Sequence, residues 1–163
     1  MIKMFENEAR KLFLKYAIPS LKLHIERGIL SEEGFEEAVK AVAENKEPEN
    51  IEKSFAVAEA MCYRYSNGKV NEKTVREYFL FKHDEVIEKK AKLIRNFDSE
   101  RCRVYRGEVL QVEDGYALVK TPLEKRRYRT DFIHEIKKGG IVSVHYDFVV
   151  EELTADILKG MEQ

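Results

Sequence analysis

Two residues in the last third of the chain, Cys102 and His145, have side chains that could bind a metal together. A cysteine thiolate is a soft, strongly donating ligand and an imidazole is a borderline one, so the pair suits a transition metal. Two protein ligands alone would leave such a metal open to transfer. The pair therefore favours a protein that handles a metal over an enzyme.

Three arginines lie close to Cys102 in the sequence. Arg101 and Arg103 flank the cysteine, and Arg106 directly precedes Gly107. Positive charge beside a thiol lowers its pKa and raises its thiolate fraction at neutral pH. The same charges would attract an anionic complex. We assign Arg101, Arg103 and Arg106, together with the neighbouring Gly107, to partner binding.

The residues before Cys102 are expected to form helices. From Phe5 to about Phe97, apolar residues recur at helical spacing and the breaks fall at turn-forming residues. The first expected helix runs from Phe5 to Tyr16, and Pro19 either ends it or opens the next turn. The others are a short stretch at 21–25, a helix capped by Ser31, a helix over 51–65, and a long helix from the Asn71 cap to about Arg95.

After Arg101 the apolar pattern changes to a period of two. Asp114 and Gly115 form a two-residue hairpin signal, Gly107 marks a bulge or close-packing point, and Thr154 can cap a short helix. Five short strands within about sixty residues indicate a closed or nearly closed barrel, because an open sheet of that size would leave exposed edges. The expected strands are 103–112, 116–120, 125–130, 141–146 and 148–153.

The sequence therefore predicts an α+β protein with two domains. A helical bundle would occupy residues 1–98, and a small five-stranded OB-like barrel with a short C-terminal helix would occupy residues 99–163. The boundary is placed at the polar segment 96–101.

Two motifs in the barrel region occur in a recognisable order. Residues 102–109 read CRVYRGEV, and residues 139–153 read GGIVSVHYDFVVEEL. This region, to about residue 161, resembles the HypC/HybG/HupF family of hydrogenase maturation chaperones. Their barrel opens with a cysteine, a glycine follows five residues later, and a later strand carries a histidine. The resemblance implies a HypC-like barrel in which Cys102, assisted by His145, binds iron transiently.

By the same resemblance, the iron carries cyanide and carbon monoxide, and the partners are other hydrogenase maturation proteins and a hydrogenase large-subunit precursor. The chain departs from the family in two ways. About a hundred residues precede Cys102, which in the family follows the initiator methionine, and Arg106 and Asp147 replace a proline and a glycine. The helical region lies outside the resemblance, and we expect it to supply an extra docking face.

A second hypothesis rests on the most basic short run of the chain. Lys125, Arg126, Arg127 and Arg129 surround Tyr128, and a small barrel with such a patch could bind single-stranded RNA through backbone contacts and stacking. Acidic neighbours and a neutral total charge make a solvated hairpin the simpler interpretation.

The third hypothesis is an interaction adaptor without metal chemistry. Cys102 would then be a small packed residue, and His145 would be an ordinary barrel histidine. Cys62 is expected in a helical core. His83 and Asp84 resemble half of a metal or acid–base site, but no second ligand occurs four residues away, so we expect them on the bundle surface.

Composition limits the remaining classes. The 163 residues carry a net charge of −1, with 44% apolar and 36% charged residues, which gives no overall bias towards nucleic acid or anionic membranes. No apolar run approaches the roughly 20 residues of a membrane span. We expect a cytoplasmic protein whose two cysteines are free thiols.

Overall fold

The computed structural model describes residues 4–49, 51, 55–93 and 99–161. The chain divides into two compact units, Met1–Phe81 and Lys82–Gln163, and we call them the helical unit and the barrel unit. The helix that follows the division therefore belongs with the barrel. Residues 96–98, half of the polar segment where the sequence predicts the domain boundary, lie outside the described residues.

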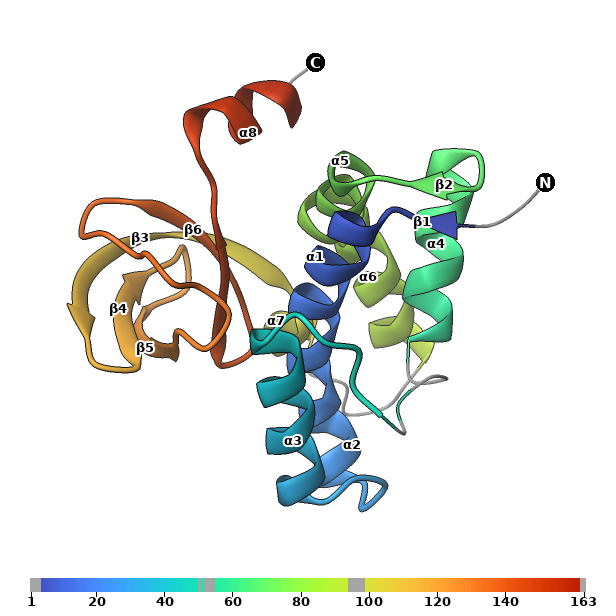
Figure 1. Ribbon diagram of the computed structural model, residues 1–163, viewed down its shortest axis with the longest axis horizontal. Helices are drawn as coiled ribbons and strands as arrows, with labels where there is room; N and C mark the ends of the chain where they lie inside the picture. The colour runs from blue at the N-terminus through green and yellow to red at the C-terminus, as the bar shows by residue number, and fades with distance from the viewer. Residues whose placement is uncertain (1–3, 50, 52–54, 94–98, 162–163) are drawn as a thin grey trace. The chain divides into compact units, whose positions relative to one another are not determined.

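The helical unit is built from short helices and one small strand pair (Figure 1). Two predicted caps are confirmed, because Ser31 Oγ accepts a hydrogen bond of 3.0 Å from Gly34 N and Asn71 Oδ1 accepts one of 2.9 Å from Thr74 N. The elements are β1 (Met4–Phe5), α1 (Asn7–Ala17), the 3₁₀ turn η1 (Ile18–Leu21), α2 (Lys22–Glu26), α3 (Glu32–Ala43), α4 (Ala56–Ser66), β2 (Lys69–Val70), α5 (Glu72–Glu77) and the π-helical turn η2 (Tyr78–Lys82).

Two elements of this unit differ from the sequence prediction. Phe5 lies in β1, which pairs in parallel with β2, and not in the first helix. The long helix expected from Asn71 is interrupted by η2 before it resumes as α6 (His83–Leu93). The wider π-helical turn allows the neighbouring residues Tyr78 and Phe79 both to be buried, with 2% of each exposed.

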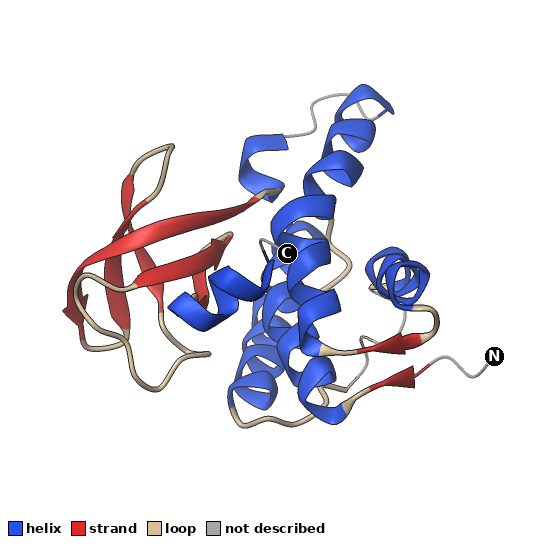
Figure 2. Cartoon of the chain, turned by 90° about the horizontal axis from the view of Figure 1, so that it is seen from above, coloured by secondary structure: helices blue, strands red, loops and turns tan. Residues whose placement is uncertain are grey.

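The barrel unit contains the predicted closed sheet, so the α+β prediction is confirmed. Figure 2 shows its strands in red, and their order around the barrel is β3-β4-β5-β7-β6, with β6 pairing back to β3. All pairs are antiparallel except the single β5–β7 pair, Arg129 with Phe148. The strands are β3 (Val104–Glu113), β4 (Tyr116–Lys120), β5 (Lys125–Arg129), β6 (Ile141–His145) and β7 (Phe148–Glu152).

Three helices accompany the barrel strands in this unit. They are α6, the four-residue α7 (Ser99–Cys102) and α8 (Ala155–Met161). Thr154 Oγ1 accepts a hydrogen bond of 3.3 Å from Ile157 N, which confirms the predicted cap of α8. The sequence predicts a polar boundary segment over 99–101, where the structure has this helical turn, because a single turn shows no recognisable period.

Gly107 is a close-packing point, as predicted. A Cβ atom at this position would lie 2.5 Å from Val119 Cγ1 and 2.9 Å from the carbonyl oxygen of Lys120, so only glycine lets β3 approach β4 here. The hairpin between these strands turns at Asp114 and Gly115 as predicted, with Gly115 at φ +77°. The buried barrel core consists of Val109, Ala117, Val119, Tyr128, Val142, Val144 and Val149.

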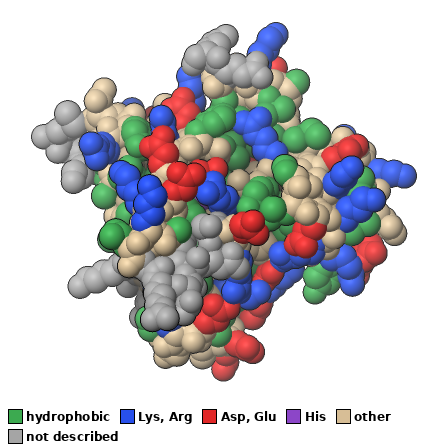
Figure 3. Space-filling model, turned by 180° about the vertical axis from the view of Figure 1, so that it is seen from behind, with side chains coloured by type: hydrophobic (Ala, Val, Ile, Leu, Met, Phe, Trp, Pro, Cys, Tyr) green, Lys and Arg blue, Asp and Glu red, His purple; other side chains and the backbone are tan. Residues whose placement is uncertain are grey.

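Charged side chains of both signs are mixed on the face drawn in Figure 3, as the near-neutral total predicts. None of the helices in the described ranges has the length and apolar character that crossing a bilayer requires.

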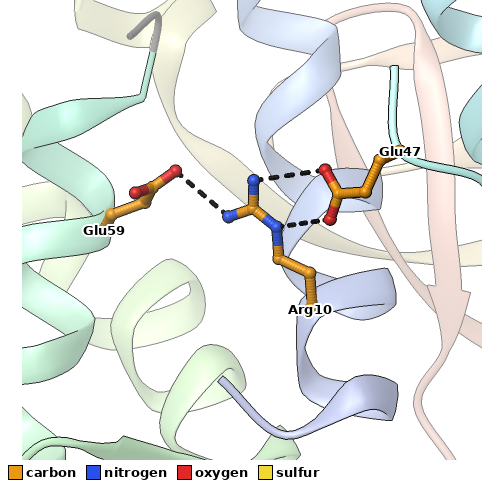
Figure 4. Close-up of polar contacts among 3 residues, drawn as sticks. All are labelled: Arg10, Glu47 and Glu59. Carbon is orange, nitrogen blue, oxygen red and sulfur yellow. Dashed lines mark hydrogen bonds and ion pairs between the residues drawn. The ribbon is translucent and has the colours of Figure 1, made fainter. Parts of the chain in front are cut away.

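The core of the helical unit is aromatic and is flanked by one charged cluster. The rings of Phe13 and Phe79 are 5.7 Å apart. Arg10 on α1 lies between two carboxylates (Figure 4): its Nε is 2.8 Å from Glu47 Oε1, and its Nη1 is 3.1 Å from Glu59 Oε1. The guanidinium also lies 5.3 Å from the ring centroid of Phe13, so Arg10 joins α1, α4 and the segment after α3.

Candidate functional site

The two predicted metal ligands lie side by side in the barrel unit. Cys102 is the last residue of α7, and β3 begins two residues later with Val104, which pairs with His145 on β6. Because of this register, His145 Nε2 lies 3.1 Å from the carbonyl oxygen of Cys102. The barrel thus brings together two residues that are 43 positions apart in the sequence.

This contact determines the tautomer of the His145 ring. A carbonyl oxygen only accepts hydrogen bonds, so Nε2 must donate its hydrogen to Cys102. In the neutral ring the lone pair is then on Nδ1. Histidines that bind metals commonly donate their other N–H to a backbone carbonyl in this way, which fixes the tautomer and the ring orientation.

The thiol of Cys102 is covered. Its Sγ lies 2.7 Å from the hydroxyl oxygen of Tyr146, and the two groups share a hydrogen bond in which either can donate. Cys102 and His145 are 3% and 2% exposed. Both cysteines of the chain are free thiols, as predicted.

Tyr146 is held in a strained turn. His145 pairs with Phe148, so Tyr146 and Asp147 form the two-residue connection between β6 and β7, and Tyr146 has φ +53°. A bulky residue rarely adopts a positive φ. Arg126 on β5 binds both turn residues, through a 3.2 Å hydrogen bond to the Tyr146 carbonyl and an ion pair with Asp147.

His83 belongs to the same cluster, although the sequence placed it on the bundle surface. Its ring meets the ring of His145 edge to face, with centroids 5.5 Å apart. Burial lowers the pKa of His83 well below its usual value of 6.5, and the charges of His145, Lys90 and Arg103 lower it further, so His83 is neutral at pH 7. The sequence could not indicate this contact, because helical spacing does not reveal a partner 62 residues further along the chain.

The arginines assigned to partner binding have different surroundings. Arg101 lies 5.7 Å from the ring centroid of Tyr146, next to the thiol. Arg103 binds two carboxylates on α6, with contacts of 3.3 Å to Asp84 and 3.3 Å to Glu88. Arg106 is exposed on β3, and Gly107 serves strand packing. Arg101 and Arg103 are therefore the members of this group that border the cysteine site.

A pocket of about 380 Å³ opens beside the cluster. Its lining includes Arg101 and Arg103 from either side of Cys102, together with Tyr105 and Tyr146. Cys102 itself does not line the pocket. Tyr146 therefore contacts the thiol through its hydroxyl and is also one of the residues that line the pocket.

The basic run on β5 is largely neutralised by neighbouring carboxylates. Arg126 pairs with Asp147, Arg127 with Glu113 at 2.8 Å, and Arg129 with Asp131 at 2.9 Å. Arg126 and Arg127 also stack on tyrosines, Tyr128 and Tyr116, each 4.6 Å from the ring centroid. These pairs favour the solvated-hairpin interpretation of Lys125, Arg126, Arg127 and Arg129 over an RNA surface.

The ligand set around Cys102 remains small. Within the described ranges, no group of three or more His, Cys, Asp or Glu side chains is placed to bind a metal ion. The contact between the two predicted ligands joins His145 Nε2 to the backbone carbonyl of Cys102. The fold and this cluster define the class of the molecule as an α+β protein with a small closed barrel that covers a cysteine–histidine pair. No protein-family model matches the chain, and no curated protein matches it either.

Proposed function

We propose that this protein is a non-enzymatic accessory protein for metalloenzyme assembly, similar to the HypC-type hydrogenase maturation chaperones. Cys102 would be the main contact for an iron cargo and His145 its helper. The observation that carries the proposal is the hydrogen bond from His145 Nε2 to the carbonyl of Cys102, which lies two residues before the first strand of the closed barrel. A cytoplasmic location and hydrogenase partners are part of the same proposal.

Three features of the barrel unit support this role. The hydrogen bond leaves Nδ1 of the neutral His145 ring as the nitrogen with a lone pair. The neighbouring His83 is held neutral, so it adds no positive charge next to His145. Arg101, beside the thiol, supplies a positive charge that suits an anionic iron complex.

The same geometry requires a change of conformation before cargo is loaded. The Cys102 thiol is 3% exposed and shares a hydrogen bond with Tyr146. A cargo can reach the sulfur only after that contact breaks. We therefore expect a closed state, which the structure describes, and an open state that a partner or the cargo stabilises.

The direct test is to purify the protein without oxygen from cells that co-express hydrogenase maturation factors. Iron content and the infrared bands of cyanide and carbon monoxide are compared for the wild type, Cys102→Ala and Cys62→Ala. We expect iron and bands in the wild type and in Cys62→Ala, and their loss in Cys102→Ala. If all three lack iron and bands in cells where a HypC-type chaperone does load, the iron-carrier role is wrong.

His145 is tested with a substitution that separates its two roles. In His145→Gln the side-chain amide can still donate a hydrogen bond to the Cys102 carbonyl, but it has no imidazole nitrogen for a metal. We expect His145→Gln to remain folded and to retain less iron than the wild type. Iron retention equal to the wild type would remove His145 from the cargo site and leave Cys102 alone there.

The RNA hypothesis is tested separately, because it depends on other residues. RNA binding would weaken steeply with salt and would fall in the double substitution of Arg126 and Arg127 by alanine. The chaperone proposal expects Cys102→Ala to lose partner binding and the arginine variant to retain it. An adaptor without metal chemistry would be indifferent to both changes.

A further inference from the structure

We infer that Tyr146 is a positioning residue that covers the Cys102 thiol and separates it from the neighbouring pocket. Partner or cargo would then reach the sulfur through that pocket once the tyrosine has moved. This inference rests on the proposed function, because it concerns access to the residue that is proposed to bind the cargo. It predicts a property, thiol accessibility, that can be measured without iron.

The position of Tyr146 supports this inference. Its hydroxyl lies 2.7 Å from Cys102 Sγ, and the same residue lines the pocket of about 380 Å³. Arg101 and Arg103, on either side of Cys102, also line this pocket, whereas Cys102 does not. The residues on both sides of the cysteine thus line the pocket, and the hydroxyl of Tyr146 contacts the thiol.

The conformation of the turn that carries Tyr146 also supports it. Tyr146 is one of three non-glycine residues with positive φ in the described ranges, and the others are asparagines, which tolerate this region much better. Such a conformation persists only where surrounding contacts hold it. Here those contacts are the Arg126 hydrogen bond to the Tyr146 carbonyl, the Arg126–Asp147 ion pair and the thiol itself.

These contacts also indicate how the thiol would be released. Arg126 is anchored through the backbone carbonyl of Tyr146 and not through its ring. The ring can therefore change rotamer while the turn stays bound to β5. The contacts of the ring that have to break include the hydrogen bond to Cys102, the Arg101 contact at 5.7 Å and the His145 contact at 4.9 Å.

The experiment measures how fast Cys102 reacts with a small neutral aromatic disulfide in the full-length native protein. In this reaction the Cys102 thiolate attacks one sulfur of the reagent, a mixed disulfide forms, and one aromatic thiolate leaves. Mass spectrometry of the digested protein assigns the label to Cys102 or to Cys62. We expect the wild type to react much more slowly at Cys102 than after unfolding in urea.

Two variants of Tyr146 divide its contribution. Tyr146→Phe keeps the ring and loses the hydroxyl, so the reaction should be about fivefold faster, as expected for the loss of one hydrogen bond. Tyr146→Gly removes the ring and suits the positive φ, and it should react at least about tenfold faster than Tyr146→Phe. Tyr116→Phe removes a hydroxyl from the same barrel, where the side chain is 41% exposed, and should behave as the wild type.

Equal labelling rates at Cys102 in the wild type, Tyr146→Phe and Tyr146→Gly would overturn the inference. A wild-type rate equal to that of the unfolded chain would overturn it as well, because the thiol would then be uncovered. If Tyr146→Gly does not fold, Tyr146→Phe still decides between the outcomes. If the protein loads no iron but the Tyr146 variants label faster, the proposed cargo is wrong and Tyr146 still covers the thiol. If the protein loads iron but the Tyr146 variants label at the wild-type rate, only the covering role of Tyr146 is wrong.

Discussion

The two cysteines of this chain are almost equally buried, and their surroundings are very different. Cys62 on α4 is 0% exposed, and Cys102 at the end of α7 is 3% exposed. Burial raises the pKa of the Cys62 thiol to about 12, with a smaller contribution from the charge of Glu59. Cys102 is instead in contact with the hydroxyl of Tyr146, beside a pocket.

Low solvent exposure therefore does not distinguish a thiol that packs in a core from one that can react. Exposing Cys62 requires that the core of the helical unit open, because the residue lies inside a packed helix bundle. Exposing Cys102 requires that one side chain in a hairpin turn move. What matters is therefore the free energy of the smallest motion that uncovers the sulfur.

The largest expected effect tests whether the two thiols are protected by separate units. Gly107→Ala places a methyl group 2.5 Å from Val119 Cγ1 and 2.9 Å from the Lys120 carbonyl, and Val119 is fully buried and cannot yield. We expect a loss of about 3 kcal/mol in the stability of the barrel unit. Hydrogen exchange read by mass spectrometry should show faster exchange in β3–β7 and unchanged exchange in α1 and α4.

Gly160→Ala is the matched control, since it adds the same methyl group to α8 where no atom lies within 4 Å. It should leave the barrel unit unchanged or stabilise α8 by up to about 1 kcal/mol. Equal acceleration of exchange in both units of Gly107→Ala would break the comparison, because the two thiols would then share one unfolding event.

The second prediction concerns alkaline pH and Cys62. The folded pKa of about 12 is higher than the ordinary value of 9.0, so the neutral thiol is favoured in the folded state. Its contribution to stability is complete below pH 9 and is lost as the pH rises towards 12. Between pH 9 and pH 10.5 the helical unit should lose about 2 kcal/mol through this group.

Urea unfolding of the wild type and Cys62→Ala at the two pH values isolates this contribution. The wild type should lose about 2 kcal/mol more than the variant between pH 9 and pH 10.5. Equal losses would mean that Cys62 is solvated, and the contrast with Cys102 would then disappear.

The local part of the structure could be predicted from the sequence. Ser31 and Asn71 were identified as caps because the hydrogen bond of a cap spans only three residues. The Asp114–Gly115 turn and the alternating pattern of the strands were predicted, and Gly107 was recognised as a packing point. Each of these features depends on residues close together in the chain, where spacing carries information.

The covering of the site could not be predicted in the same way. The contact between Cys102 and Tyr146 spans 44 residues and depends on the strand register that carries the β6–β7 turn next to α7. His83 reaches His145 from α6, although the two residues are far apart in the sequence. The β1–β2 pair and the η2 turn are too short to show any periodicity.

The third prediction compares serine at the two cysteine positions. Cys62→Ser places a hydroxyl in the helical core and should cost about 1–2 kcal/mol. Cys102→Ser places the same hydroxyl next to the Tyr146 hydroxyl, which can pair with it, and should cost less than about 0.5 kcal/mol. Chemical denaturation of both variants gives the difference. A larger loss for Cys102→Ser would mean that the sulfur itself fits that position, and the thiol would then resemble a packed core residue.

The smallest expected effect comes from the charged cluster on the helical unit. Arg10→Met removes the contacts to Glu47 and Glu59 and the interaction with the Phe13 ring. Because Glu47 is 59% exposed, solvent screens most of the ion pair, and we expect a loss of about 1 kcal/mol. Thermal unfolding followed by circular dichroism measures this loss.

Lys11→Met is the matched control for Arg10→Met, since Lys11 makes one exposed contact of 3.0 Å to Glu8 on the same helix. It should change stability by less than about 0.5 kcal/mol. The labelling rates then connect the cluster to the two thiols. Arg10→Met should increase labelling of Cys62, which lies on α4, the helix that Arg10 contacts through Glu59, and should leave Cys102 at the wild-type rate. Faster labelling of Cys102 would mean that the helical unit controls the tyrosine, and closure of the site would no longer be a property of the barrel unit alone.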